Sequence, residues 1–473
     1  MSGNTREVRK MKILLALPRF RPNTNPPLGL AYIAACLEKE NFEVEILDPT
    51  FESLEYAENR LKKTDYDMLG VSCYTMNYNK GLRFAGIAKR MNPNCVIVFG
   101  GVHPTILADE VISEKFVDIV CVGEGEETMV ELSIAIKKGQ PLSNIRGIIY
   151  RENGKIVRNP PRPLRVNLDD IPFPCRELLP IRKYLNAQIG RAAWAVEQPA
   201  TSVLATRGCP FRCTFCSSHL IFGRKVRCRS ASNVIDEIEE LIVRYGIRGL
   251  SFVDDTFTVK RDLVSEICRE IKDRKLKIEW SCNGRPDTVT KDMLKQMKEA
   301  GCVVIAYGVE SGNQKILDNI LKKGITLEQV EKVFQLTSEV GIKSDAYFML
   351  GTPGEDINDM EDTINFARKI RADAVNFSLT VPMPKTELFE VAKKEGKIIA
   401  KSWDDYDYTR KPIFVSDKFD GMTVEKLFRK AKISFYLNIS FILRQIISIN
   451  SLGDLKKKIN GFRLLIKQLT HSM

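Results

Sequence analysis

The chain has 473 residues, of which 44% are hydrophobic and 28% charged, with 29 Gly and 21 Pro. This composition is typical of a globular protein of about two to four domains, and it excludes a disordered, collagenous or coiled-coil polymer. No run of about 18 uncharged apolar residues occurs, so we expect no membrane-spanning helix. The apolar run at residues 11–17 ends at Pro18 and Arg19, which predicts a first strand instead of a signal peptide and a cytoplasmic protein.

Residues 1–140 are predicted to form a first domain in which short apolar strands alternate with amphipathic helices. This alternation is typical of a doubly wound, Rossmann-like parallel sheet. Such sheets bind ligands at the carboxyl ends of their strands. The predicted strands cover residues 11–17, 42–47, 68–72, 95–99 and 118–122.

Residues 141–200 have a different pattern. Two short strands flank the turn residues Glu152-Asn153-Gly154, which indicates a hairpin, and a proline-rich linker follows. Residues 201–395 return to strand–helix alternation with six units. Because full closure of an α/β barrel takes about eight units, six predict an open, partial (βα)6 barrel. Residues 396–473 have helical periodicity and are predicted to be a basic helical segment.

Three cysteines are clustered in a loop directly after the first predicted barrel strand. Cys209, Cys213 and Cys216 have the spacing C-x3-C-x2-C. Three thiolates on one loop can hold three irons of a 4Fe-4S cluster and leave the fourth iron open to a substrate. The alternative is a zinc site with His219 as a fourth ligand. Structural zinc sites usually add a second cysteine pair, which is missing from this sequence, and the spacing therefore favours the cluster.

This cysteine loop, together with the six-unit barrel, resembles the radical S-adenosylmethionine (SAM) enzymes over residues 200–395. In that family the cluster donates an electron to SAM, and the radical that results abstracts hydrogen from an unactivated carbon. The resemblance implies a set of SAM contacts at the strand ends of the barrel. They are Phe215 beside the adenine, Asp254 and Asp255 near the amino group, Asn283 and Arg285 near the ribose and carboxylate, and Glu310, Ser311 and Gly351 around the ribose and adenine.

A doubly wound domain ahead of such a barrel resembles the cobalamin-binding subfamily. Typical cobalamin domains carry D-x-H-x-x-G, and at the matching place this chain has Asn-Pro-Pro-Leu-Gly-Leu, with Pro27 in the position of the cobalt-ligating histidine. This form resembles the class of anaerobic magnesium-protoporphyrin ester cyclases and hopanoid methyltransferases. The cobalamin contacts that the resemblance implies are Pro27, Leu28, Gly29, Ser72, Tyr74, Gly100, Gly101, His103 and Glu124.

The resemblance implies a cobalamin-dependent radical SAM enzyme that transfers a methyl group to an unactivated carbon. Two alternatives stay open: a cyclase of the porphyrin ester type, and a non-catalytic iron–sulfur or cobalamin sensor. The expected substrate is a small molecule, with a preference for an apolar one. Low-potential reduction implies flavodoxin or ferredoxin as the electron donor. We assign no catalytic acid or base.

The end of the chain carries most of the positive charge. From residue 421 onward there are ten Lys or Arg and two acidic residues, which is +8 of the total net charge of +12. Apolar groups lie at residues 435–437, 441–443 and 464–466. A basic amphipathic helix can lie on an anionic membrane. Alternatively, and more commonly, its apolar side packs on its own domain. We expect no nucleic-acid partner, because aromatic and basic residues do not interleave regularly.

Overall fold

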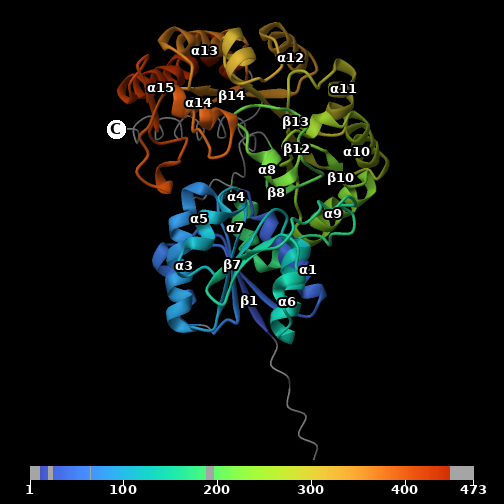
Figure 1. Cartoon of the computed structure of the whole chain (residues 1–473). Coiled ribbons are helices and arrows are strands. Elements are labelled where there is room, and N and C mark those ends of the chain that lie inside the picture. Colours follow the sequence, from blue (N-terminus) through green and yellow to red (C-terminus); the bar gives the residue numbers. More distant parts are fainter. Residues whose placement is uncertain (1–10, 20–24, 64, 188–195, 448–473) are drawn as a thin grey trace, which may run out of the picture. The chain divides into compact units, whose positions relative to one another are not determined.

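The computed structural model describes residues 11–19, 25–63, 65–187 and 196–447, and it divides into two compact units (Figure 1). The first unit comprises Met1–Ala187 and Ser218–Arg229. The second comprises Gln188–Ser217 and Ser230–Met473. A short segment that follows the cysteine loop therefore belongs to the first unit, although the sequence pattern predicted it within the barrel.

The first unit is built on a seven-stranded sheet with the order β2-β1-β3-β4-β5-β6-β7. The first five of these strands in space are parallel, and β6 and β7 add the predicted hairpin antiparallel to β5. The order 2-1-3-4-5 reverses direction between β1 and β3, where doubly wound sheets bind ligands. The strands are β1 (Lys12–Ala16), β2 (Glu43–Leu47), β3 (Met68–Ser72), β4 (Val96–Gly100), β5 (Ile119–Cys121), β6 (Ile148–Glu152) and β7 (Lys155–Arg158).

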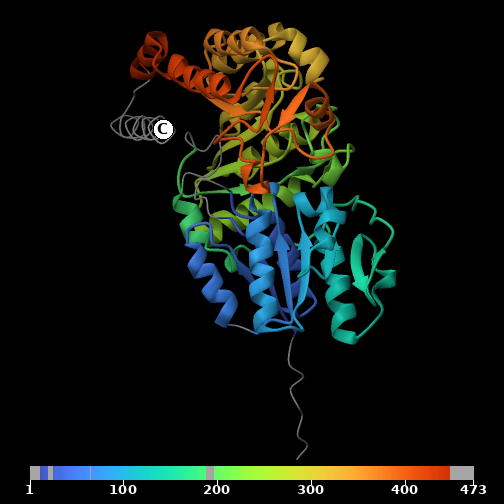
Figure 2. The same ribbon diagram turned by 60° about the vertical axis from the view of Figure 1, so that its left-hand side comes forward.

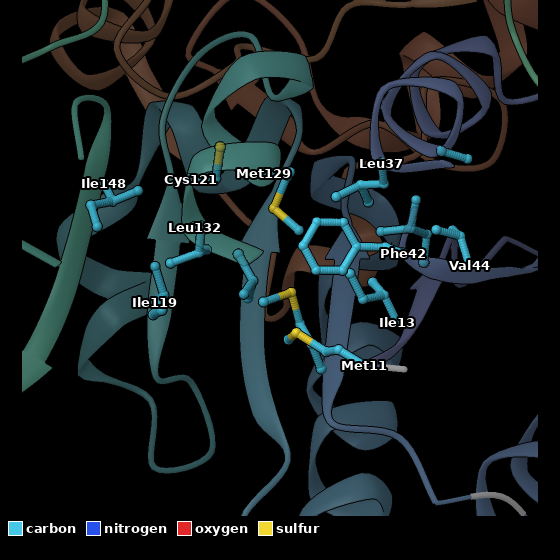
Figure 3. Close-up of a cluster of buried hydrophobic side chains, with 14 of the residues drawn as sticks. Met11, Ile13, Leu37, Phe42, Val44, Ile119, Cys121, Met129, Leu132 and Ile148 are labelled. Carbon is cyan, nitrogen blue, oxygen red and sulfur yellow. The ribbon is translucent and has the colours of Figure 1, made fainter. Parts of the chain in front are cut away.

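Helices cover this sheet and enclose its core. Ile13, Leu14 and Leu15 of β1 are all at most 1% exposed, as expected for a parallel strand covered on both faces. Ile13, Phe42 and Met129 belong to one buried apolar cluster (Figure 3). The helices are α1 (Leu28–Lys39), α2 (Leu54–Lys63), α3 (Tyr78–Met91), α4 (Val102–Ile106), α5 (Ala108–Ser113), α6 (Glu126–Lys138), α7 (Ile181–Asn186) and α8 (Ser218–Phe222).

The second unit contains an open six-stranded parallel sheet with the order β15-β14-β13-β12-β11-β8. Each strand pairs with the next strand of this sheet along the chain, which is the arrangement of a partial (βα)6 barrel and confirms the predicted fold. The strands are β8 (Ala200–Val203), β11 (Gly249–Phe252), β12 (Glu279–Gly284), β13 (Cys302–Glu310), β14 (Lys343–Leu350) and β15 (Ala374–Leu379).

Side-chain caps fix the starts of several helices in the second unit. The Thr326 hydroxyl accepts a hydrogen bond from the backbone N–H of Gln329, and Asp356 plays the same part for Asp359. The helices are α9 (Ala231–Tyr245), α10 (Arg261–Asp273), α11 (Lys291–Glu299), α12 (Leu327–Glu339), α13 (Ile357–Lys369) and α14 (Glu387–Glu395).

The end of the described chain contains two helices, α15 (Gly421–Tyr436) and α16 (Ile439–Ile447), shown in red in Figure 2. Ahead of them the structure adds an antiparallel pair, β16 (Gly396–Ile398) with β17 (Phe414–Ser416), which the helical periodicity did not predict. Gly396 permits this close pairing, because a Cβ there would lie 2.2 Å from the Val415 carbonyl oxygen. In the described part of the chain, no helix has the length and apolar character needed to cross a membrane.

Candidate active site

The cysteine loop follows β8 and the short strand β9 (Thr206–Arg207), and it is held at its centre by Thr214. The Thr214 backbone N–H donates to the Leu321 carbonyl at 3.1 Å, and its hydroxyl donates to the Ile320 carbonyl at 2.7 Å. The Thr214 carbonyl accepts from the Leu388 N–H at 3.0 Å. Thr214 is buried, whereas Cys209, Cys213 and Cys216 are all partly exposed. The loop is therefore anchored by its backbone with the thiols left accessible.

Arg285, at the end of β12, places a positive charge beside this loop. Its Nη1 lies 3.6 Å from the Cys213 sulfur, and its guanidinium carbon lies 3.5 Å from the centre of the Phe211 ring. Asp287 accepts two hydrogen bonds from it, each 3.0 Å long, and the Lys323 carbonyl accepts a third at 2.6 Å. The side chain is therefore fixed.

The residues present fit a cluster that is held by three thiolates. The loop offers three accessible sulfurs and a fixed counter-charge, and Cys209 lies 3.8 Å from the hydroxyl of Thr256. Among the described residues, no three His, Cys, Asp or Glu side chains gather closely enough to hold a single metal ion.

Asp254 lies at the predicted position after β11, and its carboxylate is already engaged by protein donors. It is fully buried and accepts hydrogen bonds from the backbone N–H groups of Ala205 and Thr206 and from the Thr206 hydroxyl. Burial raises its pKa to about 6, while these hydrogen bonds lower it. Asn283 donates to the Asp254 carbonyl at 3.1 Å. Asp254 therefore supports the backbone that leads into the cysteine loop, whereas Asp255 is exposed.

Glu310, at the end of β13, forms a buried ion pair with Lys323. The carboxylate oxygen accepts from Lys323 Nζ at 2.8 Å, and the two side chains are 12% and 6% exposed. Gly308 makes room for the pair, because a Cβ there would lie 2.5 Å from the Glu310 carboxylate oxygen. Lys323 Nζ is also 5.7 Å from the centre of the Phe215 ring. Two of the predicted SAM contacts, Glu310 and Phe215, are thus linked through one lysine.

Ser311 and Gly351 directly follow the ends of β13 and β14. Ser311 is buried, and its hydroxyl lies 3.2 Å from that of Thr363. Gly351 adopts φ +76°, and the turn that it begins is closed by Glu355, whose carboxylate accepts from the Thr352 N–H at 2.7 Å. Burial raises the pKa of Glu355 to about 8. Ser311 therefore has a packing role in the structure, and Gly351 supplies a left-handed backbone.

In the first unit, the predicted cobalamin residues follow the carboxyl ends of β1, β3, β4 and β5 in the chain or lie at those ends. Pro27 immediately precedes α1, and Leu28 and Gly29 form its first turn. Leu28 is buried, whereas Gly29 is exposed, and a Cβ on Gly29 would meet nothing within 4 Å. Proline offers no ligand atom to a metal, so these residues fit a cobalamin whose lower face receives no side chain from this position.

Ser72 and Gly100 are paired across β3 and β4. Gly101 follows with φ +88°, and a Cβ there would lie 2.8 Å from the Ser72 hydroxyl. Glycine is therefore required for the two strand ends to approach each other. Tyr74 is 48% exposed just beyond β3 and offers an aromatic face to a ligand. These residues form an accessible edge of the sheet at the carboxyl ends of β3 and β4, next to the switch point.

His103 and Glu124 are engaged within the protein. His103 is fully buried, with its ring centre 4.2 Å from that of Tyr78 and its Nδ1 3.3 Å from the Thr75 hydroxyl. Burial lowers its pKa to about 4, so the imidazole is neutral at physiological pH. Glu124 forms a bidentate ion pair with Arg227, with both N–O distances at 2.8 Å. The structure thus gives both residues contacts with protein atoms.

Sequence reasoning missed Lys323, Asp287, Phe211 and Arg227. Lys323 and Asp287 are ordinary charged residues in the sequence, and nothing in their local pattern reveals a buried partner. Phe211 could have been predicted from the sequence, since it lies between Cys209 and Cys213. An aromatic residue inside a metal-binding loop can face a cation, and that signal could have singled it out.

Comparison with known proteins agrees with this geometry. Residues 203–367 match the family model described as the radical SAM superfamily, and residues 21–133 match the B12 binding domain. An uncharacterized methyltransferase of Pyrococcus horikoshii is 37% identical over 92% of this chain and 95% of its own length. The anaerobic magnesium-protoporphyrin IX monomethyl ester cyclase of Rubrivivax gelatinosus is 30% identical over 88% of this chain and 75% of its own length.

A solved structure shares the fold. The radical SAM methyltransferase TsrM of Kitasatospora setae, which was solved with cobalamin and a 4Fe-4S cluster bound, has a TM-score of 0.68 at 20% identity, over 84% of this chain and 85% of that one. The predicted cofactors, a 4Fe-4S cluster, SAM and cobalamin, agree with these matches. The chain belongs to the B12-binding family of radical SAM enzymes.

Proposed function

We propose that this enzyme transfers a methyl group to an unactivated carbon of a small molecule. The observation that carries the proposal is that one chain combines the three-thiol loop with a B12 binding domain and matches, along nearly all of its length, a relative described as a methyltransferase. When bound, the cluster and SAM supply a radical that removes hydrogen, and cobalamin supplies the methyl group. An apolar substrate and a flavodoxin or ferredoxin as electron donor are part of this proposal.

In this proposal, residues of both units bind the cofactors. The cysteine loop would hold the cluster, and Arg285 would position the loop through its contacts with Cys213 and Phe211. The Glu310–Lys323 pair would present a carboxylate to the ribose hydroxyls of SAM. Pro27 would contribute no side-chain ligand to the cobalt, because its side chain has no donor atom.

Cyclisation is the second candidate, because a porphyrin ester cyclase is also a relative. The two activities differ in the fate of the SAM methyl group. The anaerobically reconstituted and reduced enzyme would be incubated with an extract of cell lipids and isoprenoids and with SAM that carries a deuterated methyl group. Methyl transfer predicts both 5′-deoxyadenosine and S-adenosylhomocysteine, with a labelled product in which one hydrogen atom is replaced by the deuterated methyl group.

Formation of 5′-deoxyadenosine with no label in any product would contradict methyl transfer and support the cyclase. The Cys213→Ala variant serves as the matched control, since it should make neither nucleoside product. If the reduced wild-type protein makes no 5′-deoxyadenosine at all, the chain is a binding protein or sensor, and the proposed function is wrong.

A further inference from the structure

Apolar side chains are exposed in an unusual concentration at the end of the described chain. Of the sixteen exposed large apolar residues in the described part, eight lie between residues 422 and 447. Scattered exposed apolar residues are normal in a globular protein, but a concentration in two consecutive helices marks an interaction surface. The feature is independent of the cofactor sites described above.

Helix α16 has two distinct faces. One face packs against the rest of the second unit. The Phe441 ring centre is 5.0 Å from that of Phe435 and 5.4 Å from that of Tyr436. Arg444 donates a hydrogen bond to the Arg371 carbonyl at 2.6 Å. The opposite face is formed by residues at i, i+3, i+4, i+7 and i+8, which share one side of a helix. This apolar stripe consists of Ile439, Ile442, Leu443, Ile446 and Ile447, which are 38–80% exposed.

Basic residues precede and follow the apolar stripe in the sequence. Lys426 and Arg429 are exposed on α15, and Lys430 pairs with Glu361 at 2.6 Å. Residues 448–473, which include the apolar group 464–466 and lie outside the described residues, add five Lys or Arg and one acidic residue. A second copy of the chain would bring the same net charge, which is +4 over residues 421–447 (five Lys or Arg and one Glu), and be repelled. An anionic surface is complementary to it.

We propose that the apolar stripe of α16 lies on the surface of an anionic lipid bilayer. Its isoleucine and leucine side chains would enter the boundary between headgroups and acyl chains, and Lys426 and Arg429 of α15 would contact the lipid phosphates. The helix has nine residues and would lie parallel to the surface instead of crossing the bilayer. The enzyme would then bind apolar substrates that are dissolved in the bilayer.

The test uses the full-length protein under anaerobic conditions and two kinds of vesicle, one of phosphatidylcholine alone and one that also contains phosphatidylglycerol. Sedimentation with the vesicles measures partitioning. We expect binding to the anionic vesicles that weakens as salt is added. Leu443→Asp combined with Ile447→Asp should weaken it by at least about tenfold, because two charges would enter the apolar boundary.

The matched control is Val243→Asp, which also places a charge on an exposed apolar residue of a helix. It should bind like the wild type, and circular dichroism checks that all variants are folded. Equal binding of the α16 variant and the wild type would overturn the proposal, as would equal binding to both kinds of vesicle. Self-association or RNA binding that is lost in the α16 variant, together with vesicle binding that is absent or unchanged, would also overturn the proposal.

Discussion

Arg227 is expected to be one of the most sensitive positions in the first unit. Its guanidinium donates to both carboxylate oxygens of Glu124 and to the carbonyls of Arg165 and Phe222, at distances of 2.8 to 3.2 Å. The Arg227 and Glu124 side chains are 3% and 10% exposed. Removal of one partner from a buried ion pair costs about 3–5 kcal/mol, because the other charge stays buried without compensation.

Arg227→Ala should therefore release the segment 218–229 from the first unit more readily than any surface substitution. Hydrogen exchange of the amides in this segment measures its opening free energy. A loss of about 3 kcal/mol corresponds to roughly a hundredfold faster exchange. The double variant Glu124→Leu with Arg227→Met should lose less, since it leaves no buried charge unpaired.

Arg248 provides the control. It pairs with Glu197 at 3.0 Å, but the two side chains are 65% and 48% exposed. Arg248→Ala should change the opening free energy around it by less than about 1 kcal/mol, as is usual for solvated pairs. If Arg227→Ala exchanges at the wild-type rate, or if the double variant is worse than the single one, the argument from buried charge is wrong.

Three further substitutions test other parts of the structure. Gly101→Ala should lower the free energy of unfolding, measured by urea denaturation, by about 1–3 kcal/mol. Gly123→Ala should lower it less, because both glycines have positive φ but only a Cβ at Gly101 would meet Ser72. Equal losses in the two variants would contradict this prediction. Burial raises the pKa of Glu355 to about 8, above its usual value of 4.5, so its stabilising contribution is full below about pH 4.5 and is lost as the pH rises through 8. Glu355→Gln should flatten the fall in unfolding free energy between these values, and an unchanged slope would count against the raised pKa. Cys213→Ala should lose cluster iron and 5′-deoxyadenosine formation, measured by iron analysis and chromatography, and retention of both would refute the cluster assignment.

The strand–helix alternation made both sheets predictable. Each parallel strand is a short apolar run, and each helix between strands has an amphipathic pattern, so local periodicity was enough to place them. The cysteine loop was predictable because its ligands lie within eight residues of sequence. These features depend on neighbours along the chain.

The ion pairs were not predictable for the opposite reason. Glu124 and Arg227 are 103 residues apart, and a single sequence does not reveal which of many charged residues will meet. The same holds for Asp254, whose partners at Ala205 and Thr206 lie 49 and 48 residues earlier in the chain. The predicted SAM contact of Asp254 stays a prediction, and the structure adds that its carboxylate organises the backbone before the cysteine loop.

The interleaved division of the chain has a consequence for biosynthesis. The first unit is not complete at Ala187, since Ser218–Arg229 also belongs to it. Domains usually fold as units during translation, from the amino end onward. During translation, the Glu124 carboxylate of the first unit could pair with its counter-ion only after the cysteine loop and Arg227 had been synthesised. A gene fragment that stops at Ala187 would express the same unfinished state permanently.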